Sequence, residues 1–546
     1  MIEDLRDAED GKTLEADIVI IGGGVAGITL ALELANSKLS VIVAESGGHD
    51  LEWETQALSE GAVTGTEYFA LEACRLRYLG GSSNHWDNRS YIFGEVDFAE
   101  RPWVPWSGWP IGIDHLLPFY ARAMPYAQLG PRPTPPDEMD GLAHLSLARR
   151  TDQLSDLLFY DHLGETRFGT RYRSRLEAAP NVRVLLHANV TGLPTTPDMR
   201  QIAPLEARTL EGKRVTLRGT RYVLACGGLE NPRLLLASDD RARAGVGNEN
   251  DLVGRFFMEH MNAEIVEGVA LDNVSWMEAY RYRYSPEGTS MVRNFRLNRA
   301  VQEQHGLVDI TMQVQFLEPT EDTGGAALSR LWRRTQKVVK GSVGHDLLDV
   351  VTDLRGTLGW LHDAVEYRRP AIPVGQPFQL YAQGETAPNP DSRVTLSNDR
   401  DALGMRKIDL DWRPSPIDAH SLRMTAQIAA AELTKAGLAR VRIPDWLTDE
   451  AGFFDPIRPG YHHMGTTRMS DDPRRGVVDR DCKMHTIDNL YVAGSSVYPT
   501  SGPGTPTLTL ITMAVRLADH LKALADADDD PIQIDPVARA TVTARG

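Results

Sequence analysis

The segment that most restricts the fold is DIVIIGGGVAGITLALELANSKLSVIVAES, at residues 17–46. An apolar run of strand length precedes Gly22, Gly24 and Gly27, which have G-x-G-x-x-G spacing and open a pattern with helical periodicity. A second apolar run ends in Glu45. The glycines alone are also typical of a structural turn, but this order of strand, turn, helix, strand and acid predicts a βαβ unit that binds a dinucleotide.

Each residue of this unit has an expected task. Gly22 allows a tight turn, Gly24 lets the backbone approach a pyrophosphate at the helix N-terminus, and Gly27 lets the helix pack closely against the strand. The carboxylate of Glu45 is placed to accept hydrogen bonds from ribose hydroxyls, which favours FAD or NAD over NADP. The choice between FAD and NAD depends on the rest of the chain.

Composition and charge exclude several classes of protein. The formal net charge of −17, without a long run of Lys or Arg, argues against a nucleic-acid partner. The three cysteines, Cys74, Cys226 and Cys482, form no C-x-x-C pair, which argues against a dithiol centre. The N-terminus is acidic and no run of about 18 apolar residues follows, so we expect a soluble cytoplasmic protein without a membrane span.

A second region of interest is RYLGGSSNHWDNRS at residues 77–90. Its paired glycines allow the backbone to lie close against a ligand, and its small polar side chains offer hydrogen bonds. A surface turn anchored by a tryptophan would have the same features. The candidate ligand contacts in this region are Gly80, Gly81, Ser82, Asn84 and His85.

The C-terminal part again has the pattern of a nucleotide-binding fold. A short apolar strand ends in Gly494 and Ser495, and a loop leads to a helix for which we predict Thr505 as N-cap and Pro506 as first residue. If a flavin lies there, the positive end of this helix stabilises the negative charge that develops when the ring accepts a hydride.

Together these segments resemble successive signatures of the glucose-methanol-choline (GMC) flavoprotein oxidoreductases, in the right order and over nearly the whole chain. The segments are the βαβ start, GGSSNHW at 80–86, VLACGGLENPRLLL at 223–236, APNPDSRVTLS at 387–397, HHMGTTRM at 462–469 and NLYVAGSSVYPTSGPGTPTLT at 489–509. The resemblance implies an α/β fold, with a discontinuous Rossmann-like FAD-binding domain and an α+β substrate domain built on an antiparallel sheet.

The resemblance also implies a catalytic base. In this family a histidine before a Gly-Thr pair takes the hydroxyl proton while hydride moves to flavin N5, and that spacing selects His462, with His463 turned away. Imidazole is suited to this task at neutral pH. Where the family has a second His or Asn, this chain has Thr505. Two polar residues follow Trp86, and we expect one of them, Asn88 or Asp87, to take over the role of the missing His or Asn. The alternative is that these residues only change the local shape of the loop.

Further cofactor contacts follow from the resemblance. His85 matches a position that in some members carries a covalent bond to the flavin 8α-methyl group, although we favour non-covalent FAD here. No metal is implied. The other carried-over contacts are Val190 at the adenine, Gly494 and Ser495 at the phosphates and ribityl chain, and Thr505, Pro506 and Thr507 at the pyrimidine.

We divide the chain into an FAD-binding part at 1–260, with some cap elements near 126–180, a substrate domain at 261–449, and a second FAD-binding part at 450–546. Alternating residues predict strands within 280–285, 307–319 and 378–385. A helical pattern at 327–368 is interpreted as a lid, a dimer contact or a membrane-surface helix, in that order.

The expected activity is therefore FAD-dependent oxidation of a CH–OH group to a carbonyl, with a sugar, glycoside or polyol as substrate. Oxidation of a non-sugar secondary-metabolite alcohol is one alternative. A lyase or a catalytically silent flavoprotein is another. The electron acceptor is oxygen, a quinone or another carrier, and the sequence leaves open whether the chain forms a homo-oligomer.

Overall fold

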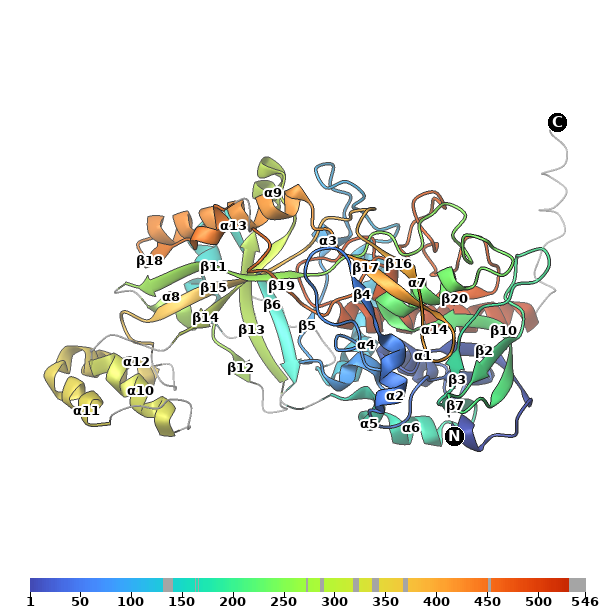
Figure 1. The fold of residues 1–546 in the computed structure, drawn as a ribbon. Helices are drawn as coiled ribbons and strands as arrows, with labels where there is room; N and C mark the ends of the chain where they lie inside the picture. The colour runs from blue at the N-terminus through green and yellow to red at the C-terminus, as the bar shows by residue number, and fades with distance from the viewer. Residues whose placement is uncertain are drawn as a thin grey trace.

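Two large β-sheets organise the molecule, which is elongated and carries one sheet in each half (Figure 1). The structure is a computed structural model. It describes residues 1–130, 141–162, 164, 166–271, 274–284, 289–317, 324–335, 343–366, 372–449 and 453–529.

The predicted βαβ unit lies at the centre of an eight-stranded sheet with the order β1-β7-β3-β2-β10-β9-β8, in which β20 also pairs with β10. The pairs from β1 to β10 and the pair with β20 are parallel, whereas β9 and β8 are antiparallel. The strands are β1 (Ile2–Asp4), β2 (Thr13–Ile21), β3 (Val41–Ala44), β7 (Val182–Leu186), β8 (Asn189–Val190), β9 (Leu205–Arg208), β10 (Arg214–Leu224) and β20 (Leu490–Val492).

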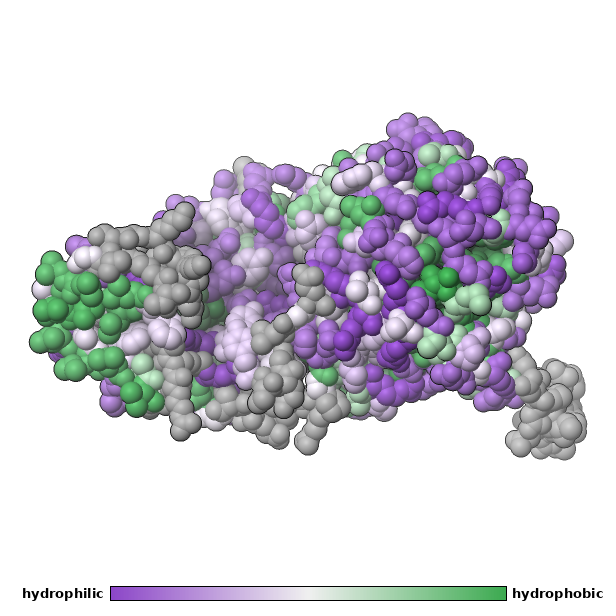
Figure 2. Space-filling view, turned by 90° about the horizontal axis from the view of Figure 1, so that it is seen from below, coloured by the Kyte–Doolittle hydropathy of each residue, from purple (hydrophilic) through white to green (hydrophobic). Residues whose placement is uncertain are grey.

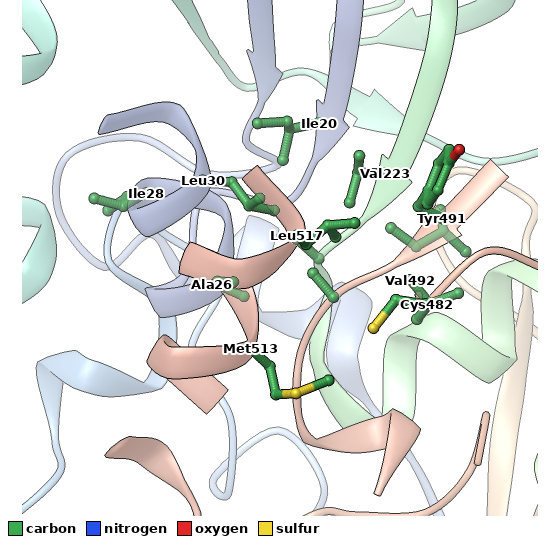
Figure 3. Close-up of a cluster of buried hydrophobic side chains, with 14 of the residues drawn as sticks. Ile20, Ala26, Ile28, Leu30, Val223, Cys482, Tyr491, Val492, Met513 and Leu517 are labelled. Carbon is green, nitrogen blue, oxygen red and sulfur yellow. The ribbon is translucent and has the colours of Figure 1, made fainter. Parts of the chain in front are cut away.

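Helices cover this sheet because its central strands are apolar on both faces. Ile20 of β2 and Val223 of β10 are fully buried, and they lie beside Leu30 of α1 and Leu517 of α14 (Figure 3). The helix α14 packs against α1 and α4. The helices of this half are α1 (Val25–Glu33), α2 (Trp53–Gln56), α3 (Glu95–Phe98), α4 (Ile113–Ala123), α5 (Phe168–Arg171), α6 (Arg173–Ala178), α7 (Gly227–Ala237) and α14 (Thr507–Asp529).

The other half is built on a nine-stranded antiparallel sheet with the order β18-β11-β15-β14-β13-β6-β5, to which β12 and β19 are added. A third sheet has the order β16-β17-β4. The strands are β4 (Gly61–Val63), β5 (Ser90–Tyr91), β6 (Leu154–His162), β11 (Met261–Ala270), β12 (Arg283–Tyr284), β13 (Thr289–Leu297), β14 (Ile310–Phe316), β15 (Pro377–Gly384), β16 (Arg393–Arg400), β17 (Arg406–Asp411), β18 (Ala439–Arg442) and β19 (Arg458–Pro459). These sheets confirm the predicted fold class.

Helices accompany the antiparallel sheet, and α13 lies along it. They are α8 (Ser275–Glu278), α9 (Arg299–His305), α10 (Gly324–Thr335), α11 (Val343–Thr352), α12 (Leu354–Glu366) and α13 (Pro416–Lys435). The predicted helical segment at 327–368 thus contains three helices, inserted between β14 and β15; residues 336–342 and 367–368 of it lie outside the described residues. Within the described ranges, no helix is both long and apolar enough to cross a bilayer.

The strand composition bears on the predicted division of the chain. The strands β5, β6 and β19 of the antiparallel sheet come from outside 261–449, and β6 lies in the region where cap elements were expected. Conversely, β16 and β17 lie within 261–449 but pair with each other and with β4. We retain the three-part division as a proposal. In it, β5 and β6 from the first FAD-binding part and β19 from the second complete the antiparallel sheet of the substrate domain.

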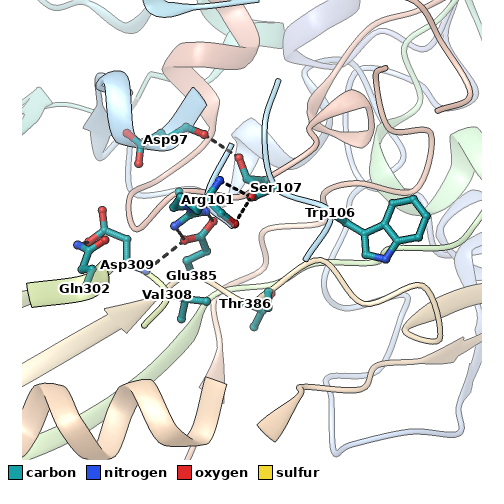
Figure 4. Close-up of polar contacts among 12 residues, drawn as sticks. Asp97, Arg101, Trp106, Ser107, Gln302, Val308, Asp309, Glu385 and Thr386 are labelled. Carbon is teal, nitrogen blue, oxygen red and sulfur yellow. Dashed lines mark hydrogen bonds and ion pairs between the residues drawn. The ribbon is translucent and has the colours of Figure 1, made fainter. Parts of the chain in front are cut away.

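A buried ion network joins the N-terminal segment to the antiparallel sheet (Figure 4). The Arg101 guanidinium donates to both oxygens of Glu385, at 2.7 and 2.6 Å, and the two side chains are 1% and 0% exposed. The backbone N–H of Asp309 donates to the same carboxylate at 3.1 Å. Asp309 is in turn paired with Arg296. The halves are thus connected by charges that have almost no contact with water.

Candidate active site

A cavity of about 780 Å³ is lined by residues of both large sheets. This volume lies in the range of roughly 300–1,000 Å³ that is typical of ligand sites. One side is formed by the first βαβ unit, the segment around residues 75–89 and the start of α7. The other side is formed by β14 and β15, and the C-terminal segments around 459–463, 493–495 and 505–507 complete it.

The glycines of the βαβ turn differ in their surroundings. Gly22 has a φ of +108°, and a Cβ there would lie 2.6 Å from the carbonyl oxygen of Ala225. A Cβ on Gly27 would lie 1.9 Å from the carbonyl oxygen of Gly22, so the helix can approach the strand only without a side chain. A Cβ on Gly24 would have no neighbour within 4 Å, and this glycine lines the cavity. The turn is therefore tight on one side and open on the cavity side.

Glu45 is held in place by the same turn. Its carboxylate accepts from the backbone N–H of Gly23 at 2.7 Å and from that of Gly47 at 2.9 Å. The side chain is 4% exposed and lines the cavity at the end of β3. Two backbone amides thus fix the carboxylate where the adenosine ribose is expected.

The cavity has the features of a cradle for a dinucleotide such as FAD. Gly227 and Gly494 have positive φ and, like Gly24, open space where a Cβ would be, so three stretches of bare backbone face the cavity. Several buried polar atoms on its lining have no hydrogen-bond partner among the described residues, among them Asn88 Oδ1, Asn189 Oδ1, His463 Nε2 and Thr505 Oγ1. Because orphaned buried polar atoms are costly, their gathering here fits a polar ligand.

Three of the predicted cofactor contacts do not line the cavity: Gly27, Gly80 and Asn84. The Asn84 side chain instead donates to the carbonyl of Leu79 at 3.1 Å, and the N–H of Gly80 donates to the carbonyl of Gly23 at 2.8 Å. These residues shape the turns around the cavity from behind. The other predicted contacts, Gly22, Gly24, Glu45, Gly81, Ser82, His85, Val190, Gly494, Ser495, Pro506 and Thr507, all lie on its lining.

The segment at 77–90 is both anchored by a tryptophan and in contact with the cavity, so each of the two sequence interpretations applies in part. Trp86 anchors it, because its indole N–H donates to the carbonyl of Thr166 at 2.8 Å. Gly81, Ser82 and His85 nevertheless lie on the cavity. Burial lowers the pKa of His85 below its usual range, and Arg167 acts in the same direction. The tryptophan therefore serves to hold a ligand-facing segment.

The predicted base, His462, lies on the cavity and contacts a second histidine. Its Nδ1 is 2.7 Å from Nδ1 of His260, and Nε2 of His260 is 2.7 Å from the carbonyl oxygen of Gly502. A carbonyl only accepts, so Nε2 of a neutral His260 carries the proton and its Nδ1 is the acceptor. His462 must then donate through Nδ1. Its Nε2 is left with a lone pair and no protein partner among the described residues.

Electrostatics support the neutral forms of both rings. Burial lowers the pKa of His260 to about 4. Burial, assisted by His260 and His463, lowers the pKa of His462 well below its usual range. At neutral pH the His462 ring is therefore an unprotonated imidazole that can accept a proton at Nε2.

A carboxylate lies beside this pair. Glu259 accepts from the Tyr68 hydroxyl at 2.5 Å, from the backbone N–H of His260 at 2.7 Å and from that of His462 at 2.9 and 3.0 Å. Burial raises the pKa of Glu259 to about 7, although these hydrogen bonds act in the other direction. Ligand atoms of Glu259, His260 and His462 lie within 4.8 Å of one another, a spacing that could hold a cation. The hydrogen bonds that Glu259, His260 and His462 make within the protein already use most of their donor and acceptor atoms.

The structure corrects the predicted role of Thr505 as a helix cap. The helix α14 begins at Thr507, and the first bond of its N-terminal turn runs from Leu510 N–H to the carbonyl of Pro506. The Thr505 hydroxyl caps nothing; it is buried and, among the described residues, unpartnered on the cavity lining. Asn88 lies on the same lining, donating to the carbonyl of Ala127 at 3.2 Å while its Oδ1 stays unpartnered.

Polar side chains of the antiparallel sheet face the cavity. Gln313 of β14 pairs with Tyr381 of β15, and Gln315 and Gln383 follow two residues away on the same face. Sequence reasoning missed these residues, although the alternation of TMQVQF and FQLYAQG contained the signal. It also missed Glu259 and His260, which directly precede β11 and carry no recognisable motif.

Comparison with known proteins gave two family matches. Residues 388–514 match the GMC oxidoreductase C-terminal model, and residues 17–246 match the FAD dependent oxidoreductase model. The 6'''-hydroxyparomomycin C oxidase of Streptomyces lividus is 25% identical, over 93% of this chain and 92% of its own length. The fructose dehydrogenase large subunit of Gluconobacter japonicus is 23% identical, over 93% of this chain and 98% of its own length.

A solved structure supports the fold. The crystal structure of formate oxidase superposes with a TM-score of 0.53 and 19% sequence identity, covering 95% of this chain and 100% of the other. The two chains therefore share an architecture over nearly their whole length.

Proposed function

Because the chain belongs to the GMC family of FAD-dependent oxidoreductases acting on CH–OH donors, we propose that it oxidises a hydroxyl of a sugar, glycoside or polyol, with His462 as the base. The observation that carries this proposal is the histidine pair, which leaves Nε2 of a neutral His462 free toward the cavity. When bound, FAD accepts a hydride. An alcohol releases hydride readily only as its O–H proton is removed, and imidazole is suited to take it.

The chain's own residues would divide the remaining tasks. His260 holds His462 in the tautomer that exposes a lone pair. Thr505 and Asn88 lie on the same cavity with oxygens that have no partner among the described residues, and we propose that they orient the reacting hydroxyl. The polar face formed by Gln313, Gln315, Tyr381 and Gln383 suits a substrate with several further hydroxyls.

The substrate class is supported by this polar lining and by two relatives that are named 6'''-hydroxyparomomycin C oxidase and fructose dehydrogenase large subunit. A hydrophobic alcohol would make no hydrogen bonds with the remaining donors and acceptors of this polar face, which is costly. We therefore prefer a polyhydroxylated substrate to a hydrophobic secondary metabolite.

Anaerobic mixing of the holoenzyme with a panel of sugars, glycosides, polyols and simple alcohols tests this proposal. We expect at least one polyhydroxylated compound to bleach the visible flavin band, because only a hydride donor reduces it. Dithionite, which reduces bound flavin chemically, serves as the positive control. Bleaching by dithionite but by no member of the panel would favour a lyase or a silent flavoprotein instead.

The positioning role of His260 predicts different effects for two substitutions. His260→Leu removes the acceptor for the His462 Nδ1–H, and we expect flavin reduction to slow by about 10- to 100-fold, the effect of losing a hydrogen bond worth roughly 1–3 kcal/mol. His260→Asn can keep an acceptor oxygen near Nδ1 and should retain most of the rate. Equal rates for the two variants in stopped-flow reduction would contradict this role.

The position of Glu259 predicts a pH dependence. Its raised pKa of about 7 means that the carboxyl is neutral below this pH and ionised above it. An ionised Glu259 would stabilise the imidazolium that forms at His462, so we expect the rate of flavin reduction to rise through about pH 7 and then level off. In Glu259→Gln this inflection should be lost, with a rate about tenfold lower than that of the natural protein at alkaline pH. An unchanged pH profile in the variant would exclude the carboxylate as its origin.

A further inference from the structure

The helices inserted between β14 and β15 do not contact the cavity. The exposed leucines and valines of α11 and α12 form an apolar surface at one end of the molecule (Figure 2). None of the described residues of α10, α11 and α12 lines the cavity, which argues against the predicted lid. The residues that select the substrate are therefore sought on the cavity lining itself, where Tyr461 has an unusual backbone.

Tyr461 has a left-handed backbone conformation, with a φ of +61°. A bulky side chain disfavours this conformation, whereas glycine adopts it freely. The conformation has a local cause. The backbone N–H of His462 donates to both oxygens of Glu259, and the backbone of Gly460 hydrogen-bonds to the same carboxylate. A left-handed residue between two amides allows both N–H groups to point at one anion.

This cause explains the backbone of Tyr461 but not its side chain. Glycine would form the same turn at a lower cost, so a tyrosine here points to a role for the ring. The ring is stacked on that of Phe69, with centroids 4.1 Å apart and planes 8° apart. Phe69 packs in turn against the buried core of the antiparallel half. The hydroxyl of Tyr461 makes no hydrogen bond with a described residue.

The surroundings of Tyr461 indicate what its ring contacts. The residue is 46% exposed, lines the cavity and directly precedes His462, the proposed base. The same cavity has the polar face formed by Gln313, Gln315, Tyr381 and Gln383. A rigid aromatic surface and a polar face match the two kinds of surface on a cyclic sugar, which has C–H groups on its flat faces and hydroxyls around its edge. An open-chain polyol has the hydroxyls but no flat apolar face.

We propose that Tyr461 is a specificity-determining residue, whose ring packs against the C–H face of a cyclic substrate and places a hydroxyl of that substrate beside His462. The enzyme then prefers sugar rings to open-chain polyols. This inference rests on the proposed oxidation of a sugar, glycoside or polyol and narrows its substrate class. Because the stacking is the same before and during hydride transfer, its loss raises KM and leaves kcat nearly unchanged.

Three variants of the holoenzyme test this inference. Tyr461→Gly keeps the turn and removes the ring, whereas Tyr461→Phe keeps the ring. Met199→Gly is the matched control, because Met199 has a φ of +57°, is also 46% exposed and lies outside the cavity. The substrates are the cyclic compound that bleaches the flavin fastest in the anaerobic panel and an open-chain polyol with the same number of carbons. Flavin content and the visible spectrum are measured for every variant.

We expect the natural protein to have a kcat/KM at least about tenfold higher for the ring than for the open-chain polyol. Tyr461→Gly should raise the KM for the ring by about tenfold and change kcat by less than about threefold, which brings the two substrates close together. Tyr461→Phe should recover most of the lost affinity. Met199→Gly should behave as the natural protein does, with the same flavin content.

Several results would overturn the inference. One is a natural protein that uses the ring and the open-chain polyol equally well, and another is an unchanged KM in Tyr461→Gly. Loss of flavin from Tyr461→Gly alone would also overturn it, because the ring would then contact the cofactor instead of the substrate. If dithionite bleaches the flavin but no compound of the panel does, the proposed function fails and this inference fails with it. That result differs from a reactive ring whose KM does not depend on residue 461.

Discussion

Replacing His462 by alanine is expected to lower turnover by about 1,000-fold, within the range of 10²–10⁴ that a general base contributes. The substitution removes an imidazole that lines the cavity, whose Nδ1 donates to His260 and whose Nε2 has no protein partner among the described residues. The bare backbone at Gly24, Gly227 and Gly494, which faces the cavity, is unchanged, so the purified variant should remain yellow. Steady-state turnover with an artificial acceptor, normalised to flavin content, provides the measurement.

His463→Ala is the matched control, because His463 is the adjacent residue and also lies on the cavity. Burial lowers the pKa of His463 to about 3, and its ring packs beside Tyr68 and Phe257. We expect a loss of less than about tenfold, since no described residue prepares this ring as a base. A large loss in His463→Ala together with a small one in His462→Ala would reverse the assignment.

Arg101→Met is expected to destabilise the fold by about 3–5 kcal/mol. The substitution leaves the Glu385 carboxylate, which is 0% exposed, without its two charged hydrogen bonds. Because this pair joins the N-terminal segment to the end of β15, the loss should appear as a lower urea midpoint. Tryptophan fluorescence of the holoenzyme during urea titration checks it.

Two control variants distinguish the effect of leaving a buried charge unpaired from the effect of losing any arginine. Arg442→Met removes a surface pair with Glu267, in which the side chains are 67% and 46% exposed, and should leave the midpoint nearly unchanged. The double variant Arg101→Met with Glu385→Leu should regain much of the stability, because no uncompensated charge remains. If the double variant is no more stable than Arg101→Met alone, the stranded carboxylate is not the cause.

Local sequence patterns predicted much of the fold. The apolar run before Gly22 became the buried strand β2, and the alternating segments at 307–319 and 378–385 contain β14 and β15. The prediction for 280–285 was less successful, because among the described residues of this segment only Arg283–Tyr284 forms a strand, and residue 280 follows α8. In the strands that were predicted correctly, the spacing of the apolar residues along the sequence matched the positions that are buried in the sheet.

The site was harder to predict because its geometry depends on distant segments. His260 and Glu259 precede β11, some 200 residues before His462, and only the fold brings them together. No local pattern marks a histidine that fixes the tautomer of another. The prediction of Thr505 as a helix cap was wrong for a local reason. Threonine is a typical cap residue, but Thr505 lies too early in the chain, since α14 begins at Thr507.

The outward-facing leucines of α11 and α12 illustrate a related limit. The sequence at 327–368 predicted helices, but not which stripe faced inward, because Arg330, Asp346 and Asp349 satisfy one another inside. A polar interior of this kind is visible only when the three helices are assembled.

The most direct test of the central claim, that a C–H hydride leaves while His462 takes the hydroxyl proton, is an isotope measurement. A substrate that bleaches the flavin would be prepared with deuterium at the reacting carbon and mixed anaerobically with the holoenzyme at saturating concentration. We predict that bleaching slows relative to the undeuterated compound, because cleavage of the C–H bond limits it. Bleaching at the same rate with both compounds would contradict the account.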